Sequence, residues 1–353
     1  MDIRGKAIVI TGGYLDTSTA KTAHGLLRGT ERFDILGVID PKFAGKDAGE
    51  VMQGQSLGIK VFATVKEYLQ TQGILRPDFC IVGVATHGGY LPPSLKEELL
   101  FAAHQGIHLV SGLHYMLHED IDFQQVVQES AIQIFDIRRI RPRKELRFWT
   151  GEIYQVKTPK IAVLGTDCAL GKRTTCRFLL ETCQSAGIRT EMIYTGQTGW
   201  MQGYKHGFIF DTTINDFISG EVERVIVACD RQEKPDLILL EGQSALRNPS
   251  GPCGAEFLIS GNIHHVVLQH RPARKYYDDT EVPIPAIESE IELIKFYGAE
   301  VIAMTLNEEG MSKQEILEYQ QEMTQKLGIP VLRPLQGELV QLIPKIQLLL
   351  ADF

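Results

Sequence analysis

The sequence predicts an α/β protein with two doubly wound domains, each built on a mainly parallel sheet. Short apolar runs alternate with helical patterns over residues 6–111 and again over residues 161–350. A basic stretch with weaker patterning separates the two series, and residues 145–158 at its end are the natural place for a domain boundary. Alternation of strands and helices is typical of parallel sheets that are covered by helices. We therefore expect one domain at residues 1–150 and a second at residues 151–353.

Length and composition limit the class of protein. A chain of 353 residues exceeds what one hydrophobic core usually supports, which agrees with two domains. Its 44% hydrophobic and 23% charged residues are the proportions of a soluble globular protein, and no apolar stretch reaches the length of a membrane span. The net charge of −8 argues against a nucleic-acid partner, so we expect the basic cluster at 138–144 to face solvent or the domain interface. Six cysteines without C-x-x-C spacing, and no signal-peptide pattern, favour a reduced, cytoplasmic protein.

The first domain begins with a predicted strand at residues 6–13, which ends in two glycines. A helix at 19–28 and a second strand at 35–39, followed by Asp40, complete the outline of a dinucleotide-binding half of the Rossmann type. The G-x-G-x-x-G fingerprint is missing, so the motif gives little support for a bound cofactor there. The alternation continues through strands at 61–62, 79–85 and 107–111 and through helices at 64–70 and 94–104.

Polar residues follow several of these strands. Ligands of open α/β sheets bind at the carboxyl ends of the strands, so Gly12, Asp40 and the loop at 86–93 should meet in one crevice. His87 lies in that loop and His114 follows the next strand, although a histidine in such a place is more often a structural hydrogen bonder than a catalyst. No third ligand occurs at a recognisable spacing, so the two histidines do not predict a metal site.

The second domain opens on a phosphate-binding pattern. A buried strand at 161–164 leads into a glycine-bounded loop, and an apolar helical pattern follows at once, to about residue 186. Glycines let backbone N–H groups turn toward an anion, the lysine adds a charge, and the helix N-terminus adds unpaired donors. An ordinary glycine-rich turn is the alternative, which the lysine and the flanking pattern disfavour. The expected phosphate-binding residues are Gly165, Thr166, Asp167, Cys168, Gly171, Lys172, Arg173, Thr174 and Thr175.

The loop departs from the usual G-x-x-x-x-G-K-[ST] pattern in two ways. Five residues separate Gly165 from Gly171, a spacing that resembles the Gly-Thr-Asp-x-x-x-Gly-Lys loop of dethiobiotin synthetase. Arg173 stands where a hydroxyl normally ligates Mg²⁺. Phosphate binding is therefore better supported by the sequence than nucleotide hydrolysis.

A second motif supports the first. Residues 235–241 form an apolar strand that ends in Glu241, and Gly242 follows as in dethiobiotin synthetase. An acid at the end of such a strand is the Walker B arrangement, in which the carboxylate holds Mg²⁺ directly or through water. If the protein uses Mg²⁺, we expect Glu241 and Thr174 to hold it.

Further candidates follow other strands of the second domain. The strand at 189–194 ends in a glycine-rich loop, which we expect to close over a substrate or cofactor. Asp211 is a candidate base that otherwise caps the predicted helix at 214–227. An asparagine after the strand at 301–306 often faces the base in P-loop relatives, which makes Asn307 a plausible adenine contact. The residues singled out in the glycine-rich loop are Gly196, Gln197 and Thr198. The remaining predicted elements are strands at 265–269 and 327–332 and helices at 287–297 and 339–350.

Motifs suitable for comparison with known families occur along nearly the whole chain: Asp16 with residues 20–26, residues 44–50, residues 165–168 with Gly171 and Lys172, and Glu241 with Gly242. They resemble a bacterial and archaeal family once catalogued only as a domain of unknown function. Its members pair an N-terminal Rossmann-like domain with a C-terminal domain like those of P-loop NTPases. The activity attached to the family is N-acetylation of D-glutamate with acetyl-CoA, so the resemblance implies this fold and this cofactor.

Three functions remain open. The first is an acetyl-CoA-dependent N-acyltransferase, whose loop holds cofactor phosphates without Mg²⁺ and gains a second cation from Arg173. Its general base would be Glu241, Asp211 or His114, which the sequence does not rank. The second is an ATP- and Mg²⁺-dependent kinase or ligase of the dethiobiotin-synthetase type that acts on a small carboxylate. The third is a non-catalytic nucleotide-binding protein, which the many polar loops at strand ends disfavour. We expect a small-molecule substrate and a homo-oligomer, without a nucleic-acid or membrane partner.

Overall fold

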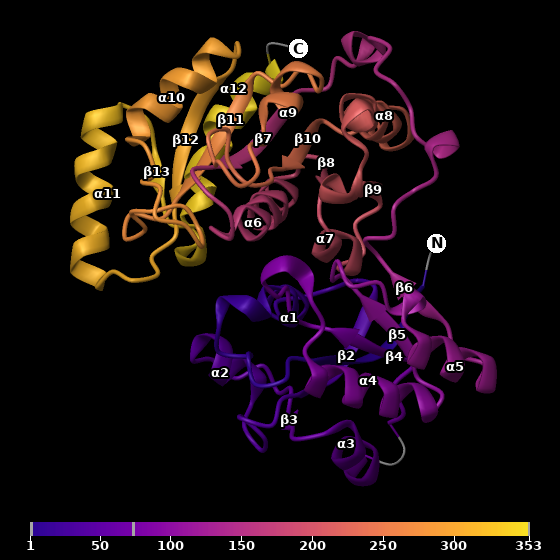
Figure 1. Ribbon diagram of the computed structural model, residues 1–353. Helices are drawn as coiled ribbons and strands as arrows, with labels where there is room; N and C mark the ends of the chain where they lie inside the picture. Colours follow the sequence, from indigo (N-terminus) through magenta and orange to yellow (C-terminus); the bar gives the residue numbers. More distant parts are fainter. Residues whose placement is uncertain (1–2, 73–74, 352–353) are drawn as a thin grey trace. The chain divides into compact units, whose positions relative to one another are not determined.

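The computed structural model describes residues 3–72 and 75–351 and consists of two compact units (Figure 1). The first unit comprises Met1–Ile140 together with Gln197–Tyr204. The second comprises Arg141–Gly196 together with Lys205–Phe353. These units differ from the predicted ranges in two places, because residues 141–150 pack with the second unit and residues 197–204 with the first.

The first unit is built on a six-stranded sheet in the order β3-β2-β1-β4-β5-β6, in which all neighbours are parallel. This is the doubly wound order of Rossmann-type domains, so the predicted fold class is confirmed. Its strands are β1 Gly5–Ile10, β2 Phe33–Ile39, β3 Val61–Phe62, β4 Phe79–Val82, β5 His108–Ser111 and β6 Ile134–Asp136. Its helices are α1 Lys21–Leu27, α2 Ala48–Gln53, α3 Val65–Gln72, α4 Pro93–His104, α5 Ile121–Glu129 and α7 Gln197–Met201.

Strand β1 explains why the sequence of this sheet is so continuously apolar. Ile8 and Ile10 belong to the core that contains Leu99 of α4, whereas Val9 belongs to the core that contains Ala23 of α1. Successive side chains of a strand point to opposite faces, so helices cover this sheet on both sides. All five side chains are fully buried.

Helix α7 corrects the prediction of a glycine-rich loop at 195–203, because residues 197–201 of that stretch are helical. It packs against α1, and Met201 is fully buried in the core of the first unit. Gln202 Nε2 donates to the carbonyls of Gly25 at 2.9 Å and Gly29 at 3.0 Å, and the guanidinium of Arg32 lies 4.3 Å from the centre of the Trp200 ring. The glycines of the sequence suggested a loop, but these contacts fix the segment as a helix.

The second unit contains a seven-stranded sheet in the order β13-β12-β11-β7-β10-β8-β9, again parallel throughout. The strand of the phosphate loop, β7, lies between β10 and β11, as expected for a P-loop domain. The strands are β7 Lys160–Gly165, β8 Thr190–Tyr194, β9 His206–Gly207, β10 Leu237–Glu241, β11 His265–His270, β12 Glu300–Leu306 and β13 Val331–Leu332. The helices are α6 Lys172–Ser185, α8 Asn215–Glu233, α9 Ala255–Ile259, α10 Ile287–Phe296, α11 Lys313–Leu327 and α12 Ile343–Ala351.

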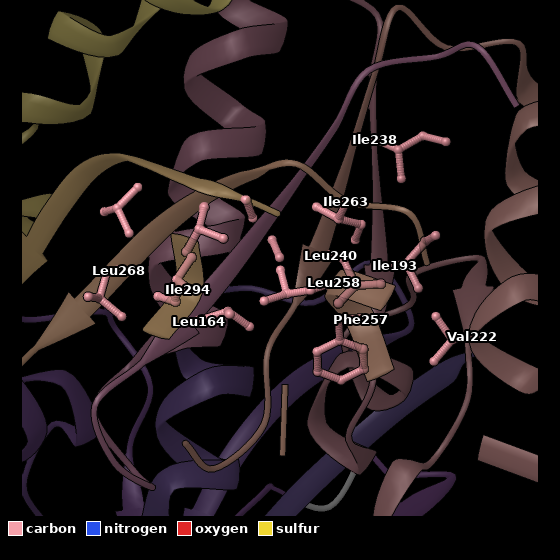
Figure 2. Packing of buried hydrophobic residues seen from close by; sticks show 14 of the residues in the cluster. Leu164, Ile193, Val222, Ile238, Leu240, Phe257, Leu258, Ile263, Leu268 and Ile294 are labelled. Carbon is pink, nitrogen blue, oxygen red and sulfur yellow. The ribbon is translucent and has the colours of Figure 1, made fainter. Parts of the chain in front are cut away.

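One face of this sheet carries a large apolar core, part of which is shown in Figure 2. Leu164, Leu240 and Leu268 come from the three central strands, and Val222 and Phe257 come from helices α8 and α9. Each is at most 3% exposed. Burying such a side chain contributes about 1.5–3 kcal/mol, so this core fixes the central strands that carry the loops of the candidate site.

The connector after residue 140 is held on α8 by two buried glutamates. Glu221 accepts hydrogen bonds from Arg141 Nη1 at 2.6 Å and Arg147 N at 3.3 Å. Glu223 accepts from Thr150 N at 2.7 Å, among other donors of the connector. Gly220 lets the connector pass close to the helix, because a Cβ atom there would lie 1.9 Å from the carbonyl oxygen of Arg147. These contacts explain why the connector belongs to the second unit.

Some elements have no counterpart in the sequence prediction. Helix α5 and strand β6 fall in the stretch where the alternation weakens, and α11 was not predicted. Helix α11 nevertheless begins with a capping box between Ser312 and Glu315, a signal that the sequence carries.

Within residues 3–72 and 75–351, no helix combines the length and the apolar character needed to cross a bilayer.

Candidate phosphate-binding site

The phosphate loop joins the end of β7 to the start of α6. Gly171 has a φ of 100° at the N-cap of α6, and Ala169 has a φ of 51°, so the chain turns twice through the left-handed region. Thr175 N donates to the carbonyl of Gly171 at 2.9 Å and closes the first turn of the helix. The first N–H groups of a helix have no partner within it, so the start of α6 can donate to an anion beside the loop.

Lys172, the first residue of α6, is buried and lies back along the loop. Its Nζ donates to the carbonyl of Asp167 at 2.6 Å and to the carbonyl of Ser244 at 2.8 Å. Gly165 leaves room for this side chain, since a Cβ atom there would lie 3.0 Å from Lys172 Cδ. Burial lowers the pKa of Lys172, because the desolvated ammonium is less stable than in water. A phosphate at the loop would compensate this charge.

Glu241 ends β10 beside the phosphate loop and is 5% exposed. Its Oε2 accepts from Thr195 N at 3.1 Å, and the backbone of Gly196 also donates to it. Burial raises the pKa of Glu241, while the charges of Arg173 and Lys172 act in the opposite direction. The carboxylate therefore lies in the field of the two loop cations.

Two hydroxyl groups of the loop form hydrogen bonds within the protein. Thr166 Oγ1 lies 2.9 Å from His270 Nδ1, and Thr175 Oγ1 donates to Gln269 Oε1 at 2.6 Å. The position directly after Lys172 is a guanidinium, which cannot ligate a cation. The part of the chain that the structure describes has no group of three or more His, Cys, Asp or Glu side chains placed to hold a metal. Arg173 and Lys172 are cations that suit the oxygens of a phosphate.

Asn307 lies next to the phosphate loop. Its Nδ2 donates to the carbonyl of Leu170 at 3.0 Å, and its Oδ1 accepts from Glu309 N at 2.9 Å. The side chain thus ties the end of β12 to the loop. Contact with an adenine stays a prediction.

Asp40 and Gly12, two predicted site residues of the first unit, both belong to the arrangement around the turn after β1. Asp40 is fully buried, and its Oδ2 accepts from Thr11 Oγ1 at 2.7 Å, Gly13 N at 3.0 Å and Leu15 N at 3.1 Å. The carboxylate therefore holds the turn after β1, in which Gly12 has a φ of 59°. These hydrogen bonds occupy much of the acceptor capacity that a ribose would require.

The two histidine loops lie against each other in the same unit. A Cβ atom on Gly89 would lie 2.6 Å from the Cβ of His114, and Tyr115 N donates to the carbonyl of Gly89 at 3.0 Å. His87 and His114 are both exposed. The structure therefore brings the two loops together at the carboxyl ends of β4 and β5, as the strand order requires.

The remaining candidates are divided by the chain itself. Gly196 stays with Glu241 in the second unit, whereas Gln197 and Thr198 belong to α7 in the first, and both are buried. Asp211 is exposed and lies in the turn Phe210–Thr212, whose first N–H donates to the carbonyl of Thr195 at 2.9 Å.

Two residues beside the loop were missed from the sequence. Asn248 and Arg274 both donate to the buried carboxylate of Asp167. They lie in loops after β10 and β11, which the sequence marks as rich in turn-forming or cationic residues. Strand order would have placed both loops next to β7, but only the geometry selects these two side chains.

Two family models match the chain. The model described as "Domain of unknown function (DUF1611_C) P-loop domain" matches residues 147–343. The model described as "Domain of unknown function (DUF1611_N) Rossmann-like domain" matches residues 41–140. Together they cover most of both units and agree with the two sheets seen here.

Similar proteins carry names and structures of their own. A protein of Tritonibacter scottomollicae named D-glutamate N-acetyltransferase is 26% identical over 262 residues, which cover 72% of this chain and 76% of that protein. A protein of the same name from Pseudoalteromonas sp. is 26% identical over 264 residues, with coverage of 72% and 77%. The crystal structure of a DUF1611 family protein from Anabaena variabilis ATCC 29413 is similar in fold, with a TM-score of 0.84 at 24% identity over 93% of this chain and 95% of that one.

Proposed function

Because the chain belongs to the DUF1611 family, we propose that it is an N-acetyltransferase that uses acetyl-CoA to acetylate a D-amino acid such as D-glutamate. The names of the two relatives supply the reaction, and the phosphate loop supplies the site for the cofactor. The observation that carries the proposal is the replacement of the usual magnesium-binding hydroxyl by Arg173 next to the buried Lys172. Two cations and a helix N-terminus bind phosphate without a metal.

The residues of the loop have distinct tasks under this proposal. Lys172 and Arg173 hold the pyrophosphate or the 3′-phosphate of the cofactor, together with backbone N–H groups at the start of α6. Glu241 balances their charge and fixes the backbone of Thr195. The bound cofactor supplies the acetyl group as a thioester, and the reaction transfers it to the amine of the substrate.

A base must take the proton that the amine loses when the new amide bond forms and the thiol of coenzyme A leaves. The long pantetheine arm of the cofactor separates the thioester from the phosphates. A carboxylate beside the phosphates, such as Glu241, is therefore a poor candidate for this base. Asp211 and His114, which are both exposed, are the better candidates among the three.

The test is acetyl transfer by the purified full-length chain. We expect N-acetyl-D-glutamate to form from acetyl-CoA and D-glutamate without added Mg²⁺, detected by mass spectrometry. Product mass is preferable to thiol release, because Cys168 of the protein is itself partly exposed. L-Glutamate and the Lys172→Ala variant are the matched controls. No acetylated product from any D-amino acid tested would refute the proposal.

A second candidate is an ATP- and Mg²⁺-dependent kinase or ligase that acts on a small carboxylate. It is favoured by one observation, the position of Glu241 at the end of the strand next to the phosphate loop. This function requires release of ADP from Mg²⁺–ATP when a carboxylate substrate is added. The same protein preparation can be assayed for both products.

A further inference from the structure

The carboxylate of Asp167 is fully buried and accepts four hydrogen bonds. Oδ1 accepts from Cys168 N at 2.6 Å and from Asn248 Nδ2 at 2.9 Å. Oδ2 accepts from Arg274 Nη1 at 2.8 Å and from Asp278 N at 2.8 Å. A carboxylate offers about four lone-pair sites, so these donors fill it. Asp167 has no acceptor site left for a ligand or a metal.

The four donors come from three separate segments. Cys168 belongs to the phosphate loop, Asn248 to the loop after β10, and Arg274 and Asp278 to the loop after β11. Arg274 Nη1 also donates to the carbonyl of Cys168 at 2.9 Å. The amide of Asn248 is oriented by Ser250, whose N and Oγ donate to Asn248 Oδ1. A single buried carboxylate therefore fastens two neighbouring loops to the phosphate loop.

The same arrangement fixes the position of Lys172. The two acceptors of its Nζ are the carbonyls of Asp167 and Ser244. The first belongs to Asp167 itself, and the second lies in the loop that Asp167 holds through Asn248. Ser244 has a φ of 36°, a left-handed conformation that costs energy outside glycine and persists only where surrounding contacts determine it.

We propose that Asp167 is a positioning residue for the phosphate site: it never touches the ligand, and it holds both backbone carbonyls that aim the ammonium of Lys172. This inference rests on the proposed phosphate-binding role of the loop and extends it to a residue that the usual P-loop pattern does not specify. It assigns the Asp of the Gly-Thr-Asp sequence to preorganisation of the site, not to metal binding or proton transfer.

The first experiment is calorimetric titration of the wild type and Asp167→Asn with pyrophosphate and with coenzyme A. Asparagine keeps the size of the side chain but offers one acceptor atom in place of two and no charge. We expect the affinity for both ligands to fall by about tenfold or more, because two of the four charge-assisted hydrogen bonds lose their acceptor. The thermal transition of each variant is measured so that the titrations are made well below it.

A double-mutant cycle separates positioning from a general loss of stability. In the Lys172→Ala background the ammonium is gone, so Asp167→Asn should lower the affinity by less than about threefold further. The double variant Asp167→Asn, Asn248→Asp exchanges the carboxylate and the amide of the contact between these two residues. We expect this double variant to recover part of the affinity that Asp167→Asn loses. A role in stability alone would leave the affinity of Asp167→Asn unchanged below its thermal transition.

Asp236→Asn is the matched control. Asp236 also pairs with an arginine, Arg189, but this exposed pair precedes β10, and we expect no change in affinity. Equal affinities of the wild type and Asp167→Asn for pyrophosphate would overturn the inference. It would also be overturned if Asp167→Asn lowered the affinity by the same factor in the wild-type and in the Lys172→Ala background. Failure of the wild type to bind pyrophosphate would overturn it together with its premise. Failure to bind coenzyme A alone would refute only the acetyl-CoA proposal.

Discussion

Replacement of Lys172 by alanine tests the phosphate loop directly. The substitution removes a buried ammonium that lies 2.6 Å and 2.8 Å from two carbonyl oxygens and supplies the only charge that the P-loop motif itself specifies. A charge-assisted contact to a phosphate contributes about 1.5–3 kcal/mol. We therefore expect the affinity for coenzyme A or pyrophosphate to fall by about tenfold to more than a hundredfold in calorimetric titrations.

The fold should survive this change. Burial lowers the pKa of Lys172, which means that the folded protein disfavours the charged form. Loss of the ammonium removes this cost and offsets the loss of its two hydrogen bonds. We expect the midpoint of urea unfolding to stay close to that of the wild type. A large shift of the midpoint would show that the ammonium is mainly a structural contact.

The lowered pKa also gives the expected pH dependence. The folded, ligand-free protein releases the proton of Lys172 at a lower pH than an unfolded chain would. The free energy of unfolding therefore rises with pH between the folded and the unfolded pKa of this lysine. Ligand affinity should change in the opposite direction, because phosphate requires the ammonium. We expect the affinity to fall as the pH rises, and to do so at a lower pH than the pKa of an ordinary lysine would give. This fall should be absent in Lys172→Ala.

Arginine should not fully replace the lysine. A planar guanidinium differs in shape from a compact ammonium, and the space beside Gly165 is narrow. Lys172→Arg should therefore bind more weakly than the wild type. The reasoning would be refuted if Lys172→Ala kept the wild-type affinity for every phosphate ligand tested, since the loop would then be a structural turn.

Three further predictions follow from other residues. Arg173→Ser restores a hydroxyl after the lysine: it should strengthen Mg²⁺–ATP binding if the protein is a ligase, whereas under the acetyl-CoA proposal titrations should show weaker or unchanged coenzyme A binding and no gain for ATP. Burial lowers the pKa of His270 to about 4, below its ordinary 6.5. As the pH drops from 6.5 to about 4, the unfolded chain takes up a proton that the folded protein does not, so the free energy of unfolding should fall by about 3 kcal/mol. His270→Gln should lose this dependence in urea titrations, and equal pH slopes in both proteins would contradict it. Gly220→Ala should destabilise the second unit by about 1–3 kcal/mol or more, because its Cβ would meet the carbonyl of Arg147 at 1.9 Å, and an unchanged unfolding midpoint would contradict this explanation.

The sequence predicts most of the strands because they are short, apolar and bounded by glycine or proline. The central strand β7 and its loop are identified by spacing alone, and the strand ending in Glu241 supports them. Helix α7 escaped prediction because its helical state depends on contacts with α1 that lie far away in the sequence. Local propensity carries no record of such contacts.

The candidate site was predictable only in part, for a similar reason. Motif spacing identifies Lys172 and Glu241, because Lys172 opens the helix after the glycine-bounded loop and Glu241 ends an apolar strand. The partners of Asp167 could not be found in this way, since Asn248 and Arg274 are 81 and 107 residues away in the chain. Strand order brings such loops together, and only side-chain geometry shows which residues meet.

The segment Gln197–Tyr204 belongs to the first unit, although strands of the second unit precede it in the chain. This arrangement affects the order in which the chain can fold. On a ribosome, all six strands of the first unit have been made by residue 136, but α7 is made only after β7, α6 and β8 of the second unit. Domains usually complete folding one after another from the N-terminus. Here the first unit must wait for a helix encoded beyond the phosphate loop, so neither unit can mature before part of the other has been synthesised. A single protease cut after Ile140 would leave α7 on the fragment that carries the second unit, so residues 1–140 would be held to that fragment only by the non-covalent contacts of the first unit.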